Sequence, residues 1–202
     1  MNKYAESEKI RTFIAVPLSS ILLAELKNVI EHLRVFSKGV NWVKPESIHL
    51  TLKFLGNLTK DELSKVFEGM EKIFKTPPPT FHLTASGLGA FPSLRRPRVL
   101  WVGIARNGLE NVLNLQKLIE AELNQRGFPP EERAFSPHLT LARIKFADNL
   151  SELMQAFTSY QFPEIEFPVE HVQVMRSDLR PHGAVYSIQK NFLLSLGQNN
   201  ER

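Results

Sequence analysis

The tetrapeptide His-Leu-Thr-Leu occurs twice in this chain of 202 residues, at 49–52 and again 89 residues later at 138–141. Each copy lies in a short apolar run that has the composition of a β-strand. Strand-like and helix-like segments alternate in a similar order around both copies. An identical tetrapeptide at matching places in two similar halves predicts a fold built from a duplicated unit.

Hydrophobic spacing predicts an α+β chain in which each half offers strand, helix, strand, helix and strand pieces. The predicted strands cover residues 11–17, 48–55, 80–87, 98–105, 138–145, 167–176 and 184–190. The predicted helices begin at Ser19 or Ser20, at Thr59 with Glu62 in a capping box, near residue 108, and at Asp148 or Asn149. We expect Gly56 to end the second strand and Leu118 to lie on the apolar face of the third helix.

Composition excludes several classes of protein. The chain has no cysteine, which rules out disulfides, thiolate nucleophiles and cysteine-based zinc sites. No run approaches the roughly 18 apolar residues of a membrane helix, and the opening MNKYAESEKIRT lacks the apolar core of a secretory signal. We therefore expect a cytosolic protein that has no membrane partner.

A net charge of +4 suits a polyanionic partner such as nucleic acid, although many other enzymes share such a charge. The densest basic stretch is Arg95, Arg96 and Arg98 around Pro97. It reads equally well as a solvated loop before a strand and as a loop that contacts RNA.

Each tetrapeptide places one imidazole and one hydroxyl on the same face of a strand. Successive side chains of a strand point to opposite faces, so His49 shares a face with Thr51, roughly 6.5–7 Å away along the chain. His138 and Thr140 do the same, while the leucines of both copies face the packed side. If the halves pack about a pseudo-two-fold axis, both pairs can surround one small group.

Two histidines and two threonines suit the opening of a phosphodiester. One histidine takes a proton from the attacking water and the other protonates the leaving oxygen, close to neutral pH. The hydroxyls can donate to the non-bridging oxygens, where negative charge builds up. No metal or cofactor is required, and the chain has no HxH or HExxH motif.

Most single histidines in apolar strands are structural, and the duplication is what favours function here. His82-Leu83-Thr84 also fits the His-x-Thr pattern, but it has no counterpart in the other half. We therefore interpret His82 as an ordinary strand residue. The remaining histidines are scattered along the sequence, at His32, His171 and His182.

These motifs and their flanks resemble the 2H phosphoesterases, and within them the bacterial and archaeal RNA 2′,3′-cyclic phosphodiesterases, also called 2′-5′ RNA ligases. The two HLTL tetrapeptides are the specific part of the resemblance. Supporting stretches extend over nearly the whole chain: RTFIAVPL, NWVKPESIHLTLKFLGNL, GLGAFPSLRRPRVLWVGI, FSPHLTLARIK and SDLRPHGAVYSI.

The resemblance implies a bilobal duplicated fold, with two pseudo-symmetric lobes, each an antiparallel-type sheet with flanking helices, around a central cleft. Residues 1–202 would form one 2H phosphoesterase domain of two intertwined lobes. His49 would be the general acid and His138 the general base, leaving a 2′-phosphate end, with reversible 2′-5′ joining as a second activity. The residues by themselves do not assign acid and base, because the two motifs are too alike.

Two further positions match the family pattern, Phe54 for nucleotide contact and Arg143 for gripping the phosphate. Strict strand alternation places both on the face opposite the threonines, unless the strands bulge or end there, or the side chains curl round the rim. Core packing is an equal interpretation of Phe54, whereas an arginine inside an apolar strand favours an anion partner. Asn41, before Trp42, stands where many relatives have a basic residue, which suggests a weaker RNA grip.

Two rival hypotheses remain. One is a 2H-type enzyme for a small cyclic nucleotide or a 2′-5′ oligonucleotide, and the other is a nucleotide- or RNA-binding module that has lost turnover. Intact histidines and threonines in both motifs argue against the second, because binding alone does not need two titratable groups in this arrangement. The sequence gives no oligomer signal, and we expect a monomer.

Overall fold

The computed structural model describes residues 9–36, 39–145, 150–180 and 183–196. Within these ranges, strands and helices alternate and confirm the predicted α+β class. In chain order they are β1 (Ile10–Val16), α1 (Ser20–Arg34), β2 (Val40–Trp42), the 3₁₀ helix η1 (Pro45–Ser47), β3 (Leu50–Leu58), α2 (Lys60–Phe74), β4 (Phe81–Phe91), β5 (Val99–Ile104), α3 (Leu109–Asn124), β6 (His138–Ile144), α4 (Ser151–Ser159), β7 (Ile165–Val169), β8 (His171–Arg180) and β9 (Gly183–Leu193).

Local capping chemistry fixes where α1 and α2 begin. The Ser19 hydroxyl accepts a hydrogen bond from the backbone N–H of Leu22, at 3.3 Å, and opens α1. At α2, Thr59 and Glu62 satisfy each other's backbone N–H in the predicted capping box. The predicted caps of α4, at residues 148 and 149, lie outside the described residues.

The predicted apolar face of α3 is wrong at Leu118, which is 44% exposed. The helix instead buries Gln116 and Glu122. Glu122 forms ion pairs with Lys72 of α2 and with Arg126. Polar side chains therefore take part in the packing of α2 on α3. Apolar periodicity alone does not detect a buried side chain whose charge is paired.

The strands form one antiparallel path in the order β7-β4-β5-β6-β3-β1-β8-β9, with β2 paired to β6. The strands β3 and β6, which contain the Leu-Thr-Leu parts of the two HLTL copies, are neighbours at the centre of this path. There Leu50 pairs with Leu139, the same position in the two tetrapeptides. A pseudo-two-fold axis between these leucines relates one half of the sheet to the other.

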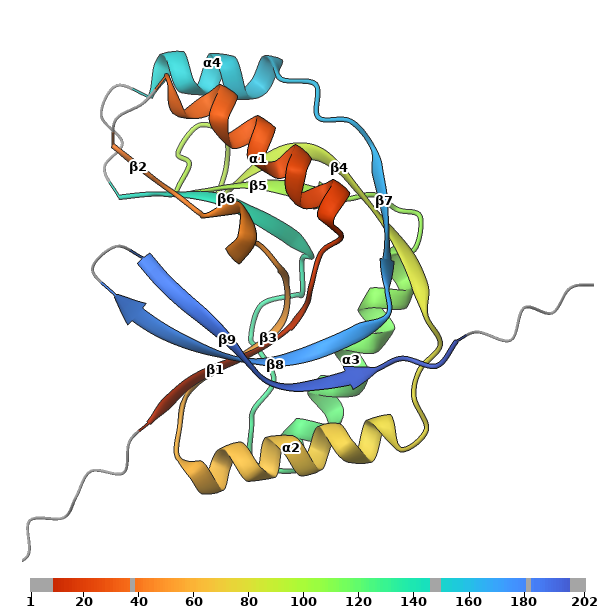
Figure 1. Cartoon of the computed structure of the whole chain (residues 1–202). Coiled ribbons are helices and arrows are strands. Elements are labelled where there is room, and N and C mark those ends of the chain that lie inside the picture. Colours follow the sequence, from red (N-terminus) through yellow and green to blue (C-terminus); the bar gives the residue numbers. More distant parts are fainter. Residues whose placement is uncertain (1–8, 37–38, 146–149, 181–182, 197–202) are drawn as a thin grey trace, which may run out of the picture.

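The two halves of the chain exchange elements across this axis. β4 follows α2 in sequence but pairs with β5, and β8, from the second half of the chain, pairs with β1. The helices cross as well, since α1 packs beside α4 and contacts β2 and β7, whereas α2 packs beside α3 and contacts β9. In Figure 1, α1 and α4 lie at the top and α2 at the bottom, with the sheet between them.

Two strand predictions need correction, and one strand was not predicted. β3 does not stop at Gly56, which adopts a φ of 75° and lets the strand continue to Leu58. The run 167–176 is divided at Glu170 into the end of β7 and the start of β8, which lie far apart in the sheet. The three-residue β2 was missed, because it is too short to show a period.

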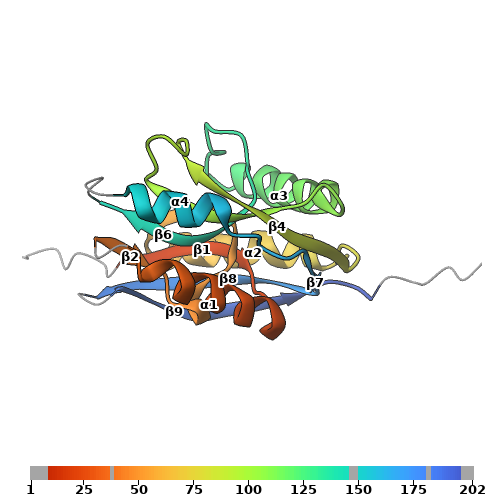
Figure 2. The same cartoon turned by 90° about the horizontal axis from the view of Figure 1, so that it is seen from above.

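The layered arrangement is also visible from above, where β8 and β9 pass along one side and α3 lies on the other (Figure 2). Leucines from both tetrapeptides are at most 2% exposed, in the same core as the apolar faces of the helices. No helix in the described part of the chain is long and apolar enough to cross a bilayer.

Candidate active site

Both motif histidines are held in the same way by the backbone just before them. Nδ1 of His49 lies 2.9 Å from the carbonyl oxygen of Ser47, and Nδ1 of His138 lies 2.8 Å from that of Ser136. A carbonyl can only accept, so Nδ1 carries the proton in both neutral rings, and Nε2 is the nitrogen that keeps a free lone pair. The repeat is therefore longer than the tetrapeptide, and the shared pattern Ser-x-His-Leu-Thr-Leu was the signal that sequence reasoning missed.

Aromatic rings surround His49 from two strands. The ring of Phe13, on β1, stacks on the imidazole with centroids 4.6 Å apart, and Tyr186, on β9, meets it edge-on at 5.2 Å. Phe54 reaches the same group, with its ring centroid 6.2 Å from that of Phe13. Phe54 is 55% exposed, so the core-packing interpretation of this residue is wrong.

His138 has a comparable aromatic setting on the other side of the axis. Phe91, at the end of β4, meets the imidazole edge-on at 4.9 Å, and Trp101, on β5, lies 6.4 Å away. Gly89 has no side chain in the space that the Trp101 indole fills, where a Cβ would come within 2.1 Å of the ring. Phe91 and Tyr186 were not identified from the sequence because both come from strands that lie far along the chain from the histidine they touch.

The threonines lie beside the histidines on the same face. Thr51 and Thr140 are half-buried, and the leucines between each His and Thr are buried on the opposite face, as predicted. Within the described residues, neither hydroxyl is hydrogen-bonded to another protein group. Both hydroxyls are therefore available to donate to a ligand.

Matching bulges bring Phe54 and Arg143 to this same face. In the pairing of β1 with β3, Ala15 faces Thr51 and Ile14 faces Lys53, so Leu52 is the extra residue. A β-bulge of this kind places two successive side chains on one side and shifts the alternation that follows.

The second copy bulges at the equivalent place. Trp101 faces Thr140 and Leu100 faces Ala142, which leaves Leu141 as the extra residue. Leu141 and Ala142 are both buried, and Arg143 after them is exposed. The disagreement between strict alternation and the family pattern is thus explained by the bulge, one of the alternatives considered above.

Burial and the positive charge of Arg143 both lower the pKa values of the two imidazoles. Burial is the largest cause that lowers the pKa of His49, to about 4, with a further lowering by the positive charge of Arg143, against the raising effect of the Ser47 carbonyl. The pKa of His138 is lowered by burial first, and also by Arg143. Because Arg143 acts on both rings, its guanidinium lies in the electrostatic reach of both histidines.

Arg143 has Asn41 of β2 and Val99 of β5 as its cross-strand neighbours. Within the described residues, Arg143 takes part in no ion pair. Its neighbours in β6, Ala142 and Ile144, are apolar. Asn41 is exposed directly beside Arg143, which makes this departure from the family pattern a neighbour of the site.

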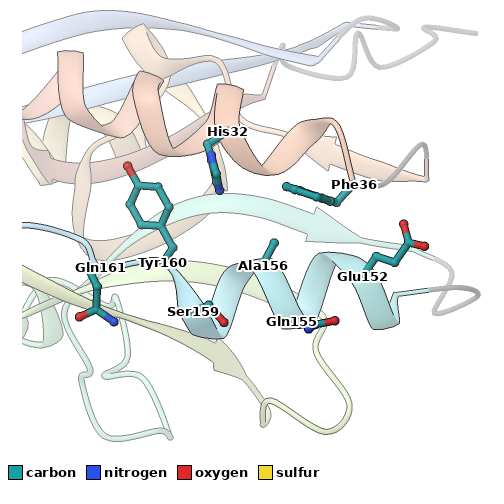
Figure 3. Close-up of a pocket in the computed structure, with 8 residues that line it drawn as sticks. All are labelled: His32, Phe36, Glu152, Gln155, Ala156, Ser159, Tyr160 and Gln161. Carbon is teal, nitrogen blue, oxygen red and sulfur yellow. The ribbon is translucent and has the colours of Figure 1, made fainter.

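The other candidate residues lie elsewhere. His82 is exposed on β4 and pairs with Pro168 of the edge strand β7. A groove of about 630 Å³ between α1 and α4 brings His32, Phe36 and Tyr160 together but contains no motif residue (Figure 3). Among the described residues, no group of three histidine or carboxylate side chains has the arrangement of a metal site.

A duplicated antiparallel fold in which a histidine and a threonine are repeated where the two central strands begin defines the class of the two-histidine phosphoesterases. The LigT-like phosphoesterase family matches the chain twice, over residues 16–101 and 102–186. The chain belongs to this family, which confirms both the resemblance and the duplication.

Similar proteins are known from several organisms. An RNA 2′,3′-cyclic phosphodiesterase of Aquifex aeolicus is 36% identical over 76% of this chain and 81% of its own length. One from Thermotoga maritima is 34% identical over 88% of this chain and 92% of its own. A crystal structure of a Thermus thermophilus protein superposes with a TM-score of 0.75 at 28% identity, over 93% of this chain and 99% of that one.

Proposed function

We propose that the protein hydrolyses RNA 2′,3′-cyclic phosphate ends to 2′-phosphate ends, by acid/base catalysis with His49 and His138. The observation that carries the proposal is that both imidazoles have Nδ1 bound to a carbonyl and lie within the electrostatic reach of Arg143. The names of the similar proteins from Aquifex aeolicus and Thermotoga maritima support the same reaction.

In the proposed reaction, water attacks phosphorus while the neutral imidazole of His138 takes one of its protons. The P–O3′ bond breaks, and the protonated imidazole of His49 gives its proton to the departing 3′ oxygen. The products are a 2′-phosphate and a 3′-hydroxyl. Thr51 and Thr140 donate to the non-bridging oxygens, and Arg143 neutralises the charge that grows on them.

The substrate itself supplies the condition for protonating one histidine. Burial keeps both imidazoles neutral near pH 7 when the site is free, because their pKa values lie below the ordinary 6.5. A bound phosphate anion favours the protonated form and raises these pKa values. Proton uptake by one histidine would then accompany substrate binding.

The acid and base roles follow the family pattern and need their own test. An aryl phosphodiester releases a phenolate that needs no proton, so loss of the general acid should matter little for it. We expect His49→Ala to lose much less activity on this substrate than on a cyclic phosphate. Equal losses on both substrates, with retention by His138→Ala instead, would reverse the assignment.

The central experiment incubates an oligonucleotide ending in a 2′,3′-cyclic phosphate with the protein in excess EDTA. We expect a 2′-phosphate product, assigned by ³¹P NMR, at a rate unaffected by the chelator. A 3′-phosphate product would mean that the 2′ oxygen leaves. A rate restored only by a divalent metal would contradict the two-histidine mechanism.

The same site supports a joining reaction in which a 5′-hydroxyl replaces water and a 2′-5′ linkage forms. This is the hydrolytic chemistry with a different nucleophile, so it needs no additional residues. Small cyclic nucleotides and 2′-5′ oligonucleotides are the alternative substrates. Comparing kcat/KM across these and the cyclic-phosphate RNA in one panel separates them.

We further propose that residues 1–202 form a single domain of two intertwined lobes, active as a cytosolic monomer. The exchange of β4 and β8 supports the single domain, since each half of the sheet contains a strand from the other half of the chain. Neither half should fold when expressed alone. Light scattering should give the mass of one chain, 23.1 kDa.

A further inference from the structure

Lys53 is a buried lysine at the bulge of β3, and it connects the first motif to the segment before the second. Its side chain is 1% exposed. The ammonium Nζ donates to Oε2 of Glu120, on α3, and to the carbonyl oxygen of Pro129, both at 2.9 Å. Pro129 lies near the start of the segment 128–137, which connects the turn after α3 to β6.

A second contact ties the same segment to β3. The backbone N–H of Phe54 donates to Oε1 of Glu131 at 3.2 Å. Segment 128–137 has no helix or strand, and a groove of about 380 Å³ lies between it and α3. Near its far end lies Ser136, whose carbonyl oxygen accepts a hydrogen bond from Nδ1 of His138. Lys53 and Phe54 of β3 therefore bind one end of an irregular segment, and the other end of this segment contacts the second histidine.

The comparison between the two copies shows that the bulge itself needs no lysine. Ala142 occupies the position of Lys53 in the second copy and is likewise buried next to a bulged leucine. A buried ammonium is costly unless it is paired, so an apolar residue would serve stability as well or better. The lysine differs from alanine in the two hydrogen bonds it makes, one of them to the segment before β6.

We propose that Lys53 is a positioning residue for His138: by binding the Pro129 carbonyl it holds the segment 128–137, and with it the Ser136 carbonyl that orients the imidazole. The first motif thus sets the geometry of the second through a contact that lies outside the reacting groups. The inference rests on the proposed function for its kinetic consequence, but the orientation of His138 can be measured without any substrate.

The test is a double variant, Lys53→Met with Glu120→Gln, which removes both charges of the buried ion pair and the contact with Pro129, while the new amide oxygen can still accept from Gln116 as Glu120 does. Removing both partners leaves no unpaired buried charge, so we expect a melting temperature near that of the wild type. Imidazole ¹⁵N NMR should show mixed tautomers for His138 and an unchanged Nδ1–H form for His49. With cyclic-phosphate dinucleotide, kcat should fall at least about tenfold while KM changes little.

The matched control is Lys72→Met, which removes another lysine that pairs with α3, through Glu122 at 2.8 Å, but does not contact the segment. It should leave the His138 tautomer and kcat unchanged. An unchanged His138 signal in the double variant would overturn the proposal, as would a double variant that fails to fold, since the lysine would then serve stability. If wild-type protein lacked turnover, the proposed function would fail while the NMR result still decided the role of Lys53.

Discussion

Phe54 and Arg143 occupy the same position in the two copies of the motif, three residues after the threonine, and matching bulges turn both to the histidine face. The two side chains differ in chemistry, one an exposed ring beside the aromatic group around His49, the other a cation that acts on both imidazoles. The strand framework is repeated in the two halves, but the exposed side chains at this position are asymmetric. A nucleotide end, with a base on one side and a phosphate on the other, is asymmetric in the same sense.

Replacing either motif histidine should abolish most activity without unfolding the protein. We expect His49→Ala and His138→Ala to lower kcat/KM by about 10² to 10⁴, the usual loss when an acid or base is removed. Circular dichroism and thermal melting should stay close to wild type. His82→Ala is the control and should keep near-normal turnover. If its turnover were as low as that of the other two variants, His49 and His138 would not be the catalytic pair.

The pH profile of kcat/KM should be bell-shaped and lie on the acid side of neutrality. The ordinary histidine pKa suggests an optimum near neutrality, but burial lowers the pKa of His49 to about 4 and also lowers that of His138. One ring must be protonated, so kcat/KM falls as pH rises above the higher of the two values in the free protein. The phosphate anion raises both in the complex, so the kcat profile should sit at higher pH. If the pH profiles of kcat and kcat/KM coincided, the bound phosphate would not raise the histidine pKa values.

The same pKa shift predicts acid sensitivity of the fold. In the unfolded chain His49 titrates near 6.5, and in the folded chain near 4, so the unfolded state binds more protons between these values. The stability that His49 contributes is fully present above pH 6.5 and is lost as pH falls towards 4, by up to about 3 kcal/mol. Urea unfolding at several pH values should show a weaker loss for His49→Gln than for wild type. Parallel curves for the two proteins would rule this out.

Local interactions made several features predictable. The cap at Ser19 and the capping box of Thr59 and Glu62 depend on residues within one turn, and the buried face of α1 follows from a 3.6-residue period. The histidine-threonine pairs needed only strand alternation. These features depend on residues that are close together in the sequence, so a local pattern is enough to predict them.

Other features depend on partners far along the chain. The bulges at Leu52 and Leu141 are defined by register against β1 and β5, so strict alternation misplaced the residues after them. Phe91 and Tyr186 reach the histidines through strands whose order in the sheet no local pattern gives. No local pattern indicates that Lys53 is buried and paired, because its acceptors are 67 and 76 residues away.

Rising salt should weaken binding of long RNA more than binding of a dinucleotide. The loop between β4 and β5 exposes Arg95 and Arg96, and it starts at Phe91, beside His138. Arg98 anchors the loop to the end of β6 by donating to the Lys145 carbonyl at 2.9 Å. Each phosphate contacted by a single strand contributes about −0.7 to the slope of log K against log salt.

The variant Arg95→Ala with Arg96→Ala removes two phosphate contacts, so it should flatten the salt slope for long RNA by about 1.4 and leave that of a dinucleotide unchanged. Lys27→Ala, on α1, where Lys27 pairs with Glu31, is the control. Equal slopes for both RNA lengths in the wild type would mean that the loop is only solvated. Binding measured by fluorescence anisotropy at several salt concentrations decides between the two interpretations.

Arg143 should act on the reaction rather than on the fold. Its guanidinium is exposed on the histidine face beyond the bulge, so removing it leaves no cavity and frees no buried partner among the described residues. A bidentate contact to phosphate is worth more than a point charge, so Arg143→Lys should be impaired less than Arg143→Ala. For the alanine variant we expect a loss above about 1.5 kcal/mol in kcat/KM, the low end for a hydrogen bond to a charged group.

The electrostatic consequence can be measured on the same variants. Because the positive charge of Arg143 lowers the pKa of both His49 and His138, Arg143→Ala should raise both values in the free protein, whereas Arg143→Lys should leave them nearly unchanged. NMR titration of the imidazoles gives these values directly. A lowered melting temperature with unchanged kcat/KM and unchanged histidine titration would remove Arg143 from the site and make it a structural residue of β6.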